Sequence, residues 1–184
     1  MRISGGVLTG RTVRLPPGTI RPAMERMRES IFAALGDLTG LSFLDLFSGS
    51  GIIALEAASR GAAPVEAVES DPLKRGTLLK NTAISPTPVL CRFMPAELYI
   101  KRAKRSFNII FCDPPFSYRY KYQLLQSVAE SSLAAEGALV LLHHPAAENA
   151  DAEFHKKDKQ FHLQKTKRYG NSAVDFFLLQ KKIL

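Results

Sequence analysis

Strand-like and helix-like segments alternate between residues 42 and 142, and this alternation constrains the fold more than any other feature. Short apolar runs predict strands, and helical spacing of apolar side chains predicts helices. The predicted strands cover residues 42–47, 65–69, 89–93, 108–112 and 138–142. The predicted helices between them cover residues 52–60, 71–83, 96–104 and 121–133. Such alternation is typical of a doubly wound α/β fold, in which helices cover both faces of a mostly parallel sheet.

The two ends of the chain add further elements to this core. Short extended stretches and turn residues in 1–18 predict an irregular hairpin, and apolar spacing predicts a helix over 22–35. Residues 161–166 and 173–180 predict two strands without a helix between them, so at least one should run antiparallel. Residues 148–159 are polar and predict a helix fragment or loop. We expect one domain over 1–184, with a basic hairpin and helix in 1–36 and the α/β core in 41–184.

The charge of the chain favours a polyanionic partner. It has 25 Lys and Arg against 17 Asp and Glu, a formal net charge of +8. Guanidinium groups suit phosphate recognition, and nucleic acid is the favoured partner. The N-terminal 28 residues hold six arginines, at positions 2, 11, 14, 21, 26 and 28. No apolar run has the ~18 residues of a membrane span, and the N-terminus lacks the apolar core of a secretory signal, which predicts a cytosolic protein. Cys91 and Cys112 are expected to be small buried apolar residues.

Two acidic residues lie near the carboxyl ends of predicted strands, where ligands of parallel sheets bind: Asp45 inside the first strand and Glu69 at the end of the second. Asp45 stands just before the turn Ser48–Gly51, whose Gly49 and Gly51 permit positive φ angles and close backbone approach. Its carboxylate could accept hydrogen bonds from a ligand ammonium. Glu69 ends the second strand and could accept hydrogen bonds from both hydroxyls of a ribose. We expect Asp71 to cap the next helix, which leaves Glu69 for a ligand.

These acidic and glycine residues alone also fit a nicotinamide-dependent oxidoreductase, because Gly49, Gly51 and Ala54 match the dinucleotide fingerprint. The turn begins later than that fingerprint usually allows, and no hydride-transfer acid is evident. His143 and His144 follow the fifth strand, and we expect them to be structural. No arrangement of His, Cys and acidic residues indicates a metal site.

The motif Asp113–Pro114–Pro115–Phe116, which follows the fourth predicted strand, distinguishes between these alternatives. Two consecutive prolines lock the backbone and remove two N–H donors. With the Asp113 carboxylate they make a rigid group of acceptors, suited to an –NH2 group. Acceptors on both N–H bonds favour a pyramidal nitrogen and direct its lone pair at an electrophile. Phe116 offers a face on which a base can stack. The motif therefore predicts an enzyme that modifies an exocyclic amine.

These residues carry a resemblance to a known family. Together, residues 45–51 (DLFSGSG) and 113–116 (DPPF) resemble the amino-methyltransferases that use S-adenosylmethionine. Residues 20–29 (IRPAMERMRE), 44–51 (LDLFSGSG), 55–62 (LEAASRGA) and 168–172 (RYGNS) are similar to the D-type 16S ribosomal RNA guanine-N2 methyltransferase family. The resemblance implies a Rossmann-like class I methyltransferase fold of seven strands with an antiparallel C-terminal strand.

The resemblance also implies an activity and its partners. The expected reaction is methylation of N2 of one guanine in small-subunit rRNA, in an assembled or assembling 30S particle, by a monomer. A DNA amino-methyltransferase that acts on adenine N6 or cytosine N4 would share the 113–116 motif, but the chain has no obvious target-recognition insertion. A non-catalytic RNA-binding protein on this fold would not need that motif.

Site residues follow from the resemblance by position. The expected roles are catalysis or base binding for Asp113, Pro114, Pro115 and Phe116, cofactor binding for Asp45, Phe47, Gly49, Gly51, Glu69, Ser70 and Ala96, and RNA binding for Arg21, Arg26, Arg28 and Arg168. The family often has an Asp-Ala pair after the third strand, and this chain has Pro95–Ala96. We therefore expect the cofactor's adenine to rely on the Ala96 amide and on apolar packing.

Overall fold

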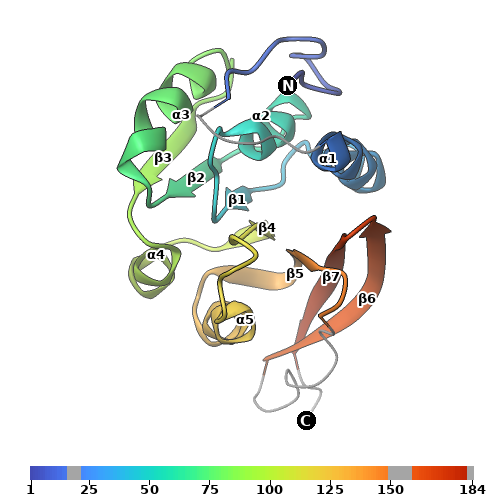
Figure 1. Cartoon of the computed structure of the whole chain (residues 1–184). Coiled ribbons are helices and arrows are strands. Elements are labelled where there is room, and N and C mark those ends of the chain that lie inside the picture. Colours follow the sequence, from blue (N-terminus) through green and yellow to red (C-terminus); the bar gives the residue numbers. More distant parts are fainter. Residues whose placement is uncertain (16–21, 149–158, 182–184) are drawn as a thin grey trace.

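The computed structural model describes residues 1–15, 22–148 and 159–181, and Figure 1 shows their arrangement. Seven strands form one sheet in the order β3-β2-β1-β4-β5-β7-β6. The strands are β1 (Phe43–Asp45), β2 (Val65–Glu69), β3 (Val89–Phe93), β4 (Phe107–Cys112), β5 (Ala134–Pro145), β6 (Lys159–Tyr169) and β7 (Ser172–Lys181). The helices are α1 (Pro22–Leu35), α2 (Ile52–Ser59), η1 (Pro72–Lys74), α3 (Arg75–Thr82), α4 (Ala96–Arg102) and α5 (Lys121–Glu130).

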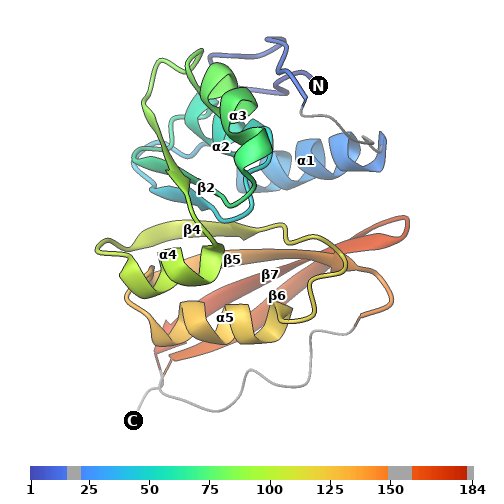
Figure 2. The same ribbon diagram turned by 60° about the vertical axis from the view of Figure 1, so that its left-hand side comes forward.

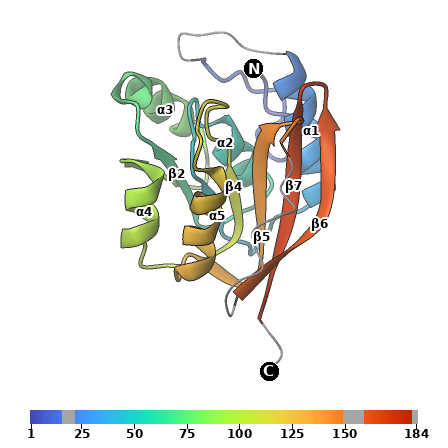
Figure 3. The same ribbon diagram turned by 60° about the horizontal axis from the view of Figure 1, so that its bottom comes forward.

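The sheet is parallel except at its C-terminal end. The pairs β1–β2, β1–β4, β2–β3 and β4–β5 are parallel, whereas β7 pairs antiparallel with both β5 and β6. Figure 3 shows β5, β7 and β6 side by side. The predicted α/β class, with a mostly parallel sheet and an antiparallel C-terminal strand, is confirmed.

Helices cover both faces of the sheet, as Figure 2 shows, with α1, α2 and α3 on one side and α4 and α5 on the other. Each face has its own apolar core. In β4, Phe111 belongs to the core under α2, and its neighbours Ile110 and Cys112 belong to the core under α5. Successive side chains of a strand point to opposite faces, so a strand covered on both sides is apolar throughout.

Several predicted boundaries differ from the observed ones. The helix predicted over 71–83 divides into η1 and α3, because the Asp71 side chain accepts a hydrogen bond from Leu73 N and starts a separate 3-10 turn. The helix predicted to reach residue 133 ends at Glu130, since Ser131 is extended and the backbone enters β5. Strand β5 is longer than predicted because it pairs with β4 on one side and β7 on the other.

The predicted irregular N-terminal hairpin is present: an antiparallel bridge joins Arg2 and Thr12, and backbone hydrogen bonds run from Ile3 N to Arg11 O and from Val13 N to Met1 O. The predicted loop over 148–159 lies almost wholly outside the described residues. Within the described ranges, no helix is both long and apolar enough to span a membrane.

Candidate active site

The carboxyl ends of β1, β2, β4 and β5 surround one cavity of about 800 Å³. Ligands of open parallel sheets bind at this edge, at the point where the strand order reverses. Here that point lies between β1 and β4, because β2 and β3 follow on one side of β1 and β4 and β5 on the other. The cavity is lined by Met24, Phe47, Glu69, Ser70, Asp71, Lys74, Pro95, Ala96, Glu97, Asp113, Pro114, Pro115, Phe116, Tyr118, His143, Tyr169, Gly170, Asn171 and Ser172. Residues from the predicted base-binding motif and from the predicted cofactor site thus share one cavity.

Asp45 is a buried acid with an unused acceptor. Its side chain is buried at the end of β1, and Ser48 Oγ donates a hydrogen bond of 2.8 Å to Asp45 Oδ2. The other oxygen, Oδ1, has no hydrogen-bond partner among the described residues. Burial raises the pKa of Asp45 to about 7; the negative charges of Asp113 and Glu69 act in the same direction, against hydrogen bonding by Ser48 and by the backbone of Ala54, which lowers the pKa. A cationic ligand would satisfy Oδ1 and favour the charged carboxylate.

The glycines of the turn after β1 have the predicted backbone geometry. Gly49 and Gly51 have φ angles of 54° and 83°, in the left-handed region that glycine adopts without strain. A Cβ atom at Gly51 would lie 2.7 Å from Leu78 Cδ1, so the Leu78 side chain on α3 would have to shift to admit a larger residue. A Cβ atom at Gly49 would meet no atom within 4 Å, which shows open space beside this part of the backbone.

Glu69 joins the first two strand ends. Its Oε2 accepts a hydrogen bond of 2.7 Å from Gly49 N, and its Oε1 accepts one of 2.8 Å from Asp71 N. Asp71 caps the 3-10 turn through its own side chain, as predicted. Each carboxylate oxygen has a second lone pair. The two backbone donors fix the orientation of Glu69, which lines the cavity and can still accept hydrogen bonds from a ligand.

Asp113 follows β4 directly, and its side chain lies 2.6 Å from His143 at the end of β5, measured from Oδ1 to Nδ1. The Phe116 ring packs edge-on against His143, with 5.3 Å between ring centroids. All three residues line the cavity, and the Asp113 side chain is 21% exposed. The carboxylate is therefore oriented by a neighbour and remains accessible.

His143 was not among the predicted site residues. The next residue, His144, has a different partner and does not line the cavity. His144 is buried, with Nε2 3.0 Å from Asp175 Oδ2. Burial lowers the pKa of His144, but the hydrogen bond and charge of Asp175 outweigh burial, so the pKa is raised. The structural role expected for the pair thus fits His144, whereas His143 belongs to the cavity. Its sequence signal is its place directly after the predicted strand 138–142, as Asp113 comes directly after 108–112. The register of β4 and β5, in which Cys112 pairs with Leu142, then brings the two side chains together.

Lys121 was also not predicted to be a site residue, because the residues around it in the sequence form no motif. Its side chain is buried at the start of α5, and Nζ donates hydrogen bonds to Phe116 O at 3.1 Å and Tyr118 O at 2.8 Å. It also lies 3.2 Å from Glu148 Oε1. The lysine therefore holds the backbone of the loop that follows Asp113.

Of the other expected cofactor residues, three line the cavity, whereas Asp45, Gly49 and Gly51 are not among its lining residues. Phe47, Ser70 and Ala96 line it, and Ala96 is the first residue of α4. The first backbone N–H groups of a helix have no partner within the helix. Pro95 provides no side-chain cap there. This arrangement is compatible with the predicted use of the Ala96 amide.

The four arginines predicted to bind RNA have different surroundings. Arg26 and Arg168 are exposed, and Arg168 Nη1 donates to Ala146 O at 2.9 Å. Arg21 lies outside the described residues. The expectation for Arg28 is corrected, because its side chain is buried and its Nε lies 2.9 Å from the buried Glu56 carboxylate. A guanidinium enclosed in this way holds the fold together and does not face a polyanion.

Among the described residues, no group of three or more His, Cys, Asp or Glu could hold a metal ion.

The chain is similar in sequence to known proteins. A family model described as Conserved hypothetical protein 95 matches residues 1–178. The chain is 32% identical over 144 residues to the ribosomal RNA small subunit methyltransferase D of Escherichia coli strain K12, covering 76% of this chain and 72% of the relative. It is also 35% identical over 89 residues to a tRNA1(Val) (adenine(37)-N6)-methyltransferase of Shewanella amazonensis, covering 47% of this chain and 38% of that protein.

Solved structures share the fold. The Escherichia coli protein yhhF superposes with a TM-score of 0.84 and 28% identity, covering 99% of both chains. The protein SMU.776, solved in complex with SAH, superposes with a TM-score of 0.71 and 17% identity, covering 86% of this chain and 50% of that one. The predicted Rossmann-like methyltransferase fold is confirmed.

Proposed function

The chain belongs to the Conserved hypothetical protein 95 family, the family of the ribosomal RNA methyltransferase D proteins, and on this premise we propose that it methylates the N2 amine of one guanine in small-subunit rRNA. One observation carries the proposal. The accessible Asp113 carboxylate lies in the same cavity as Glu69 and the aromatic ring of Phe116. That cavity therefore has acceptors for an amine, a surface for base stacking and an acid for a ribose.

The cofactor is S-adenosylmethionine, and the residues present fit it. Asp45 Oδ1 is a buried acceptor with no described partner, as the cofactor's ammonium requires. Glu69 can accept from the two ribose hydroxyls, and Gly49 leaves open space beside the turn. Phe47, Pro95 and Ala96 provide an apolar wall for an adenine. When bound, the cofactor supplies an electrophilic methyl group.

Asp113 holds the target amine in this proposal. The carbonyl of Pro115 already accepts a hydrogen bond from Tyr118 N, and that of Phe116 accepts one from Lys121. The Asp113 carboxylate and the carbonyl of Pro114, which also lines the cavity, are therefore the acceptors of the motif that remain for the two N–H bonds of the base. Fixing the amine at near-attack distance can contribute ~7–11 kcal/mol to lowering the barrier. The guanine must leave its stack to enter the cavity, at a cost of a few kcal/mol.

An adenine amine is the second candidate, because the 89-residue match is to a tRNA adenine-N6 methyltransferase. The same carboxylate and ring could hold adenine N6. The DNA amino-methyltransferase and nicotinamide-dependent alternatives receive no support from these relatives and solved structures. We also propose that the protein acts on a 30S particle, is a monomer and is located in the cytosol.

The test is methyl transfer from radiolabelled S-adenosylmethionine. Small ribosomal subunits from cells that lack the corresponding activity are the main substrate, with free rRNA, tRNA and duplex DNA in parallel. Label confined to a small-subunit rRNA guanine, located by nucleoside digestion, supports the proposal. Label on adenine, tRNA or DNA contradicts the proposed specificity, and label in none of the four substrates contradicts the proposed function.

A further inference from the structure

A second cavity, of about 280 Å³, adjoins the main one. Its lining residues are Phe116, Tyr118, Arg119, Lys121, Tyr122 and Glu148. Phe116 and Tyr118 also line the main cavity, so the two cavities share these aromatic residues. A group bound in the second cavity would therefore lie beside the base held at Asp113.

Three of the six residues that line this second cavity are aromatic, and neighbours restrain one of them, Tyr118. The Tyr118 ring makes edge contacts with Phe47 and Tyr120, at centroid distances of 5.8 Å and 6.1 Å, and its hydroxyl donates to Glu97. Tyr122 packs partly against the core under α5. Aromatic faces that are fixed in this way suit a planar ring, and base stacking tolerates any of the four bases.

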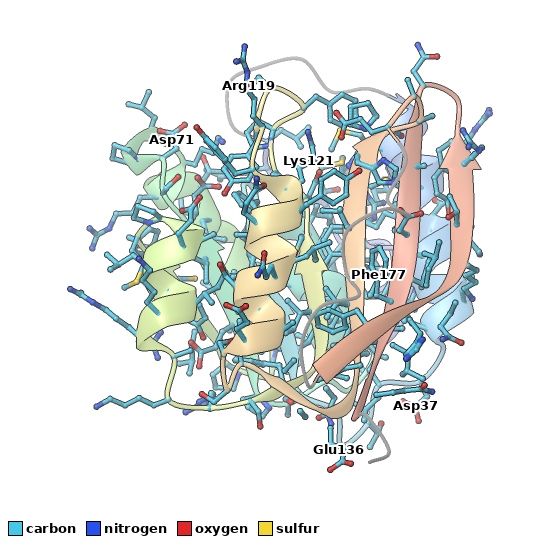
Figure 4. All side chains as sticks on the ribbon, turned by 90° about the horizontal axis from the view of Figure 1, so that it is seen from below. Asp37, Asp71, Arg119, Lys121, Glu136 and Phe177 are labelled. Carbon is cyan, nitrogen blue, oxygen red and sulfur yellow. The ribbon has the colours of Figure 1, made fainter. Side chains whose placement is uncertain are left out.

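The charges of the cavity leave one cation facing outward. Lys121 is buried and donates to Phe116 O and Tyr118 O, and it also neutralises Glu148 at 3.2 Å. Arg119 is exposed, and Figure 4 shows its side chain projecting from the edge of the molecule, whereas Lys121 lies at the start of α5. A guanidinium beside an aromatic cavity is the combination that binds a phosphate and its base together.

We propose that this second cavity, the flanking-nucleotide subsite, binds the base of the nucleotide next to the target in the same RNA strand. Arg119 then contacts the phosphate that links the two nucleotides. This inference rests on the proposed function and extends it, because it assigns recognition of the RNA strand to residues 116–122. A nucleotide inserted at this place keeps the target unstacked, since the neighbouring base finds a new stacking partner in the protein.

The experiment compares variants in RNA affinity and methyl transfer. Arg119→Ala should raise the Kd for the rRNA substrate about 5- to 10-fold and lower the slope of log Kd against log[salt] by about 0.7, as expected for one lost contact to single-stranded phosphate. Tyr122→Leu should raise Kd about 10-fold with an unchanged salt slope, because stacking is lost without loss of charge. Both variants should bind S-adenosylmethionine as the wild type does.

Matched controls separate the subsite from general effects. Lys80→Ala removes an exposed charge from α3, away from the cavity, and Tyr122→Phe keeps the ring; neither should change Kd by more than about twofold. Melting temperatures exclude a folding defect as the cause. If the wild type methylates rRNA and Arg119→Ala and Tyr122→Leu bind it as tightly as the wild type, the subsite is wrong and the proposed function stands. If the wild type methylates no RNA, the proposed function fails, and the subsite fails with it.

Discussion

The Nδ1 atom of His143 lies 2.6 Å from Oδ1 of Asp113, so a side chain at the end of β5 orients the acid that follows β4. The Phe116 ring packs edge-on against the same imidazole. A carboxylate oxygen engaged in this way leaves the second oxygen for a ligand. This contact connects the Asp113–Phe116 motif to the adjacent strand and makes the motif part of a rigid site.

Asp113 is expected to act on turnover and not on cofactor binding. Asp113→Ala removes the acceptor that holds the amine, and kcat should fall by about 100-fold or more. The Kd for S-adenosylmethionine, measured by calorimetry, should stay within about twofold of the wild-type value, because Asp45 and Glu69 are untouched. Normal turnover by Asp113→Ala would show that the amine is held elsewhere.

His143 is expected to act through Asp113 as a positioning residue. His143→Leu removes the hydrogen bond to the carboxylate, and kcat should fall about 10-fold, the effect of one charge-assisted hydrogen bond. His143→Asn keeps an N–H donor near the position of Nδ1 and should recover much of that loss. The KM for RNA should change little in both. Equal activity of the Leu and Asn variants would mean that the imidazole only fills space.

Cofactor affinity is expected to depend on pH through Asp45. Its raised pKa of about 7 means that the ligand-free protein carries a proton there below neutral pH. A cationic ligand favours the carboxylate, so binding below pH 7 must release that proton. The Kd should therefore rise about tenfold for each pH unit below 7 and level off above it. Calorimetry in buffers of different ionisation enthalpy would detect the released proton, and a flat profile between pH 5.5 and 8 would contradict the linkage.

The buried Asp45 carboxylate is expected to favour cofactor binding at the expense of the stability of the ligand-free protein. Because the folded-state pKa lies above the ordinary value of 3.8, the stability that Asp45 contributes is present below pH 3.8 and is lost as pH rises through about 7. Asp45→Asn should therefore stabilise the ligand-free protein at pH 8, by up to about 4 kcal/mol, and make no difference near pH 4. Urea unfolding at the two pH values measures this difference. The variant should bind the cofactor more weakly, and a destabilised Asp45→Asn at pH 8 would contradict the assigned burial cost.

The ion pair between Arg28 and Glu56 is expected to hold the N-terminal segment. Glu56 Oε1 also accepts a hydrogen bond of 2.7 Å from Ser4 N, and Arg28 Nη2 donates to Arg2 O at 2.7 Å. Glu56→Ala removes the buried carboxylate that pairs with the buried guanidinium of Arg28 and should lower the free energy of unfolding by about 3–5 kcal/mol. Arg26→Ala, at an exposed position of the same helix, should change it by about 0.5 kcal/mol or less. Urea unfolding measures the stability of both variants. Equal stability of Glu56→Ala and Arg26→Ala would show that the Arg28–Glu56 ion pair does not stabilise the fold.

Local patterns in the sequence were sufficient to predict most elements and the acids at the strand ends. The spacing of apolar residues and the turn residues around Gly49 and Gly51 depend on neighbours in the chain, so a linear reading finds them. The position of β7 between β5 and β6 was not predictable in this way, since strand order depends on which faces pack together after the chain has folded.

Side-chain partners that are distant in the sequence depended on the tertiary structure for the same reason. An arginine that looks like an RNA contact becomes a buried ion pair only because α1 packs against α2 and brings Arg28 to Glu56. A histidine that looks structural joins the site because β5 lies next to β4, which places His143 beside Asp113. Long-range packing chooses these partners, since the free energy of burying each charge depends on the elements around it and not on the residues next to it in the chain.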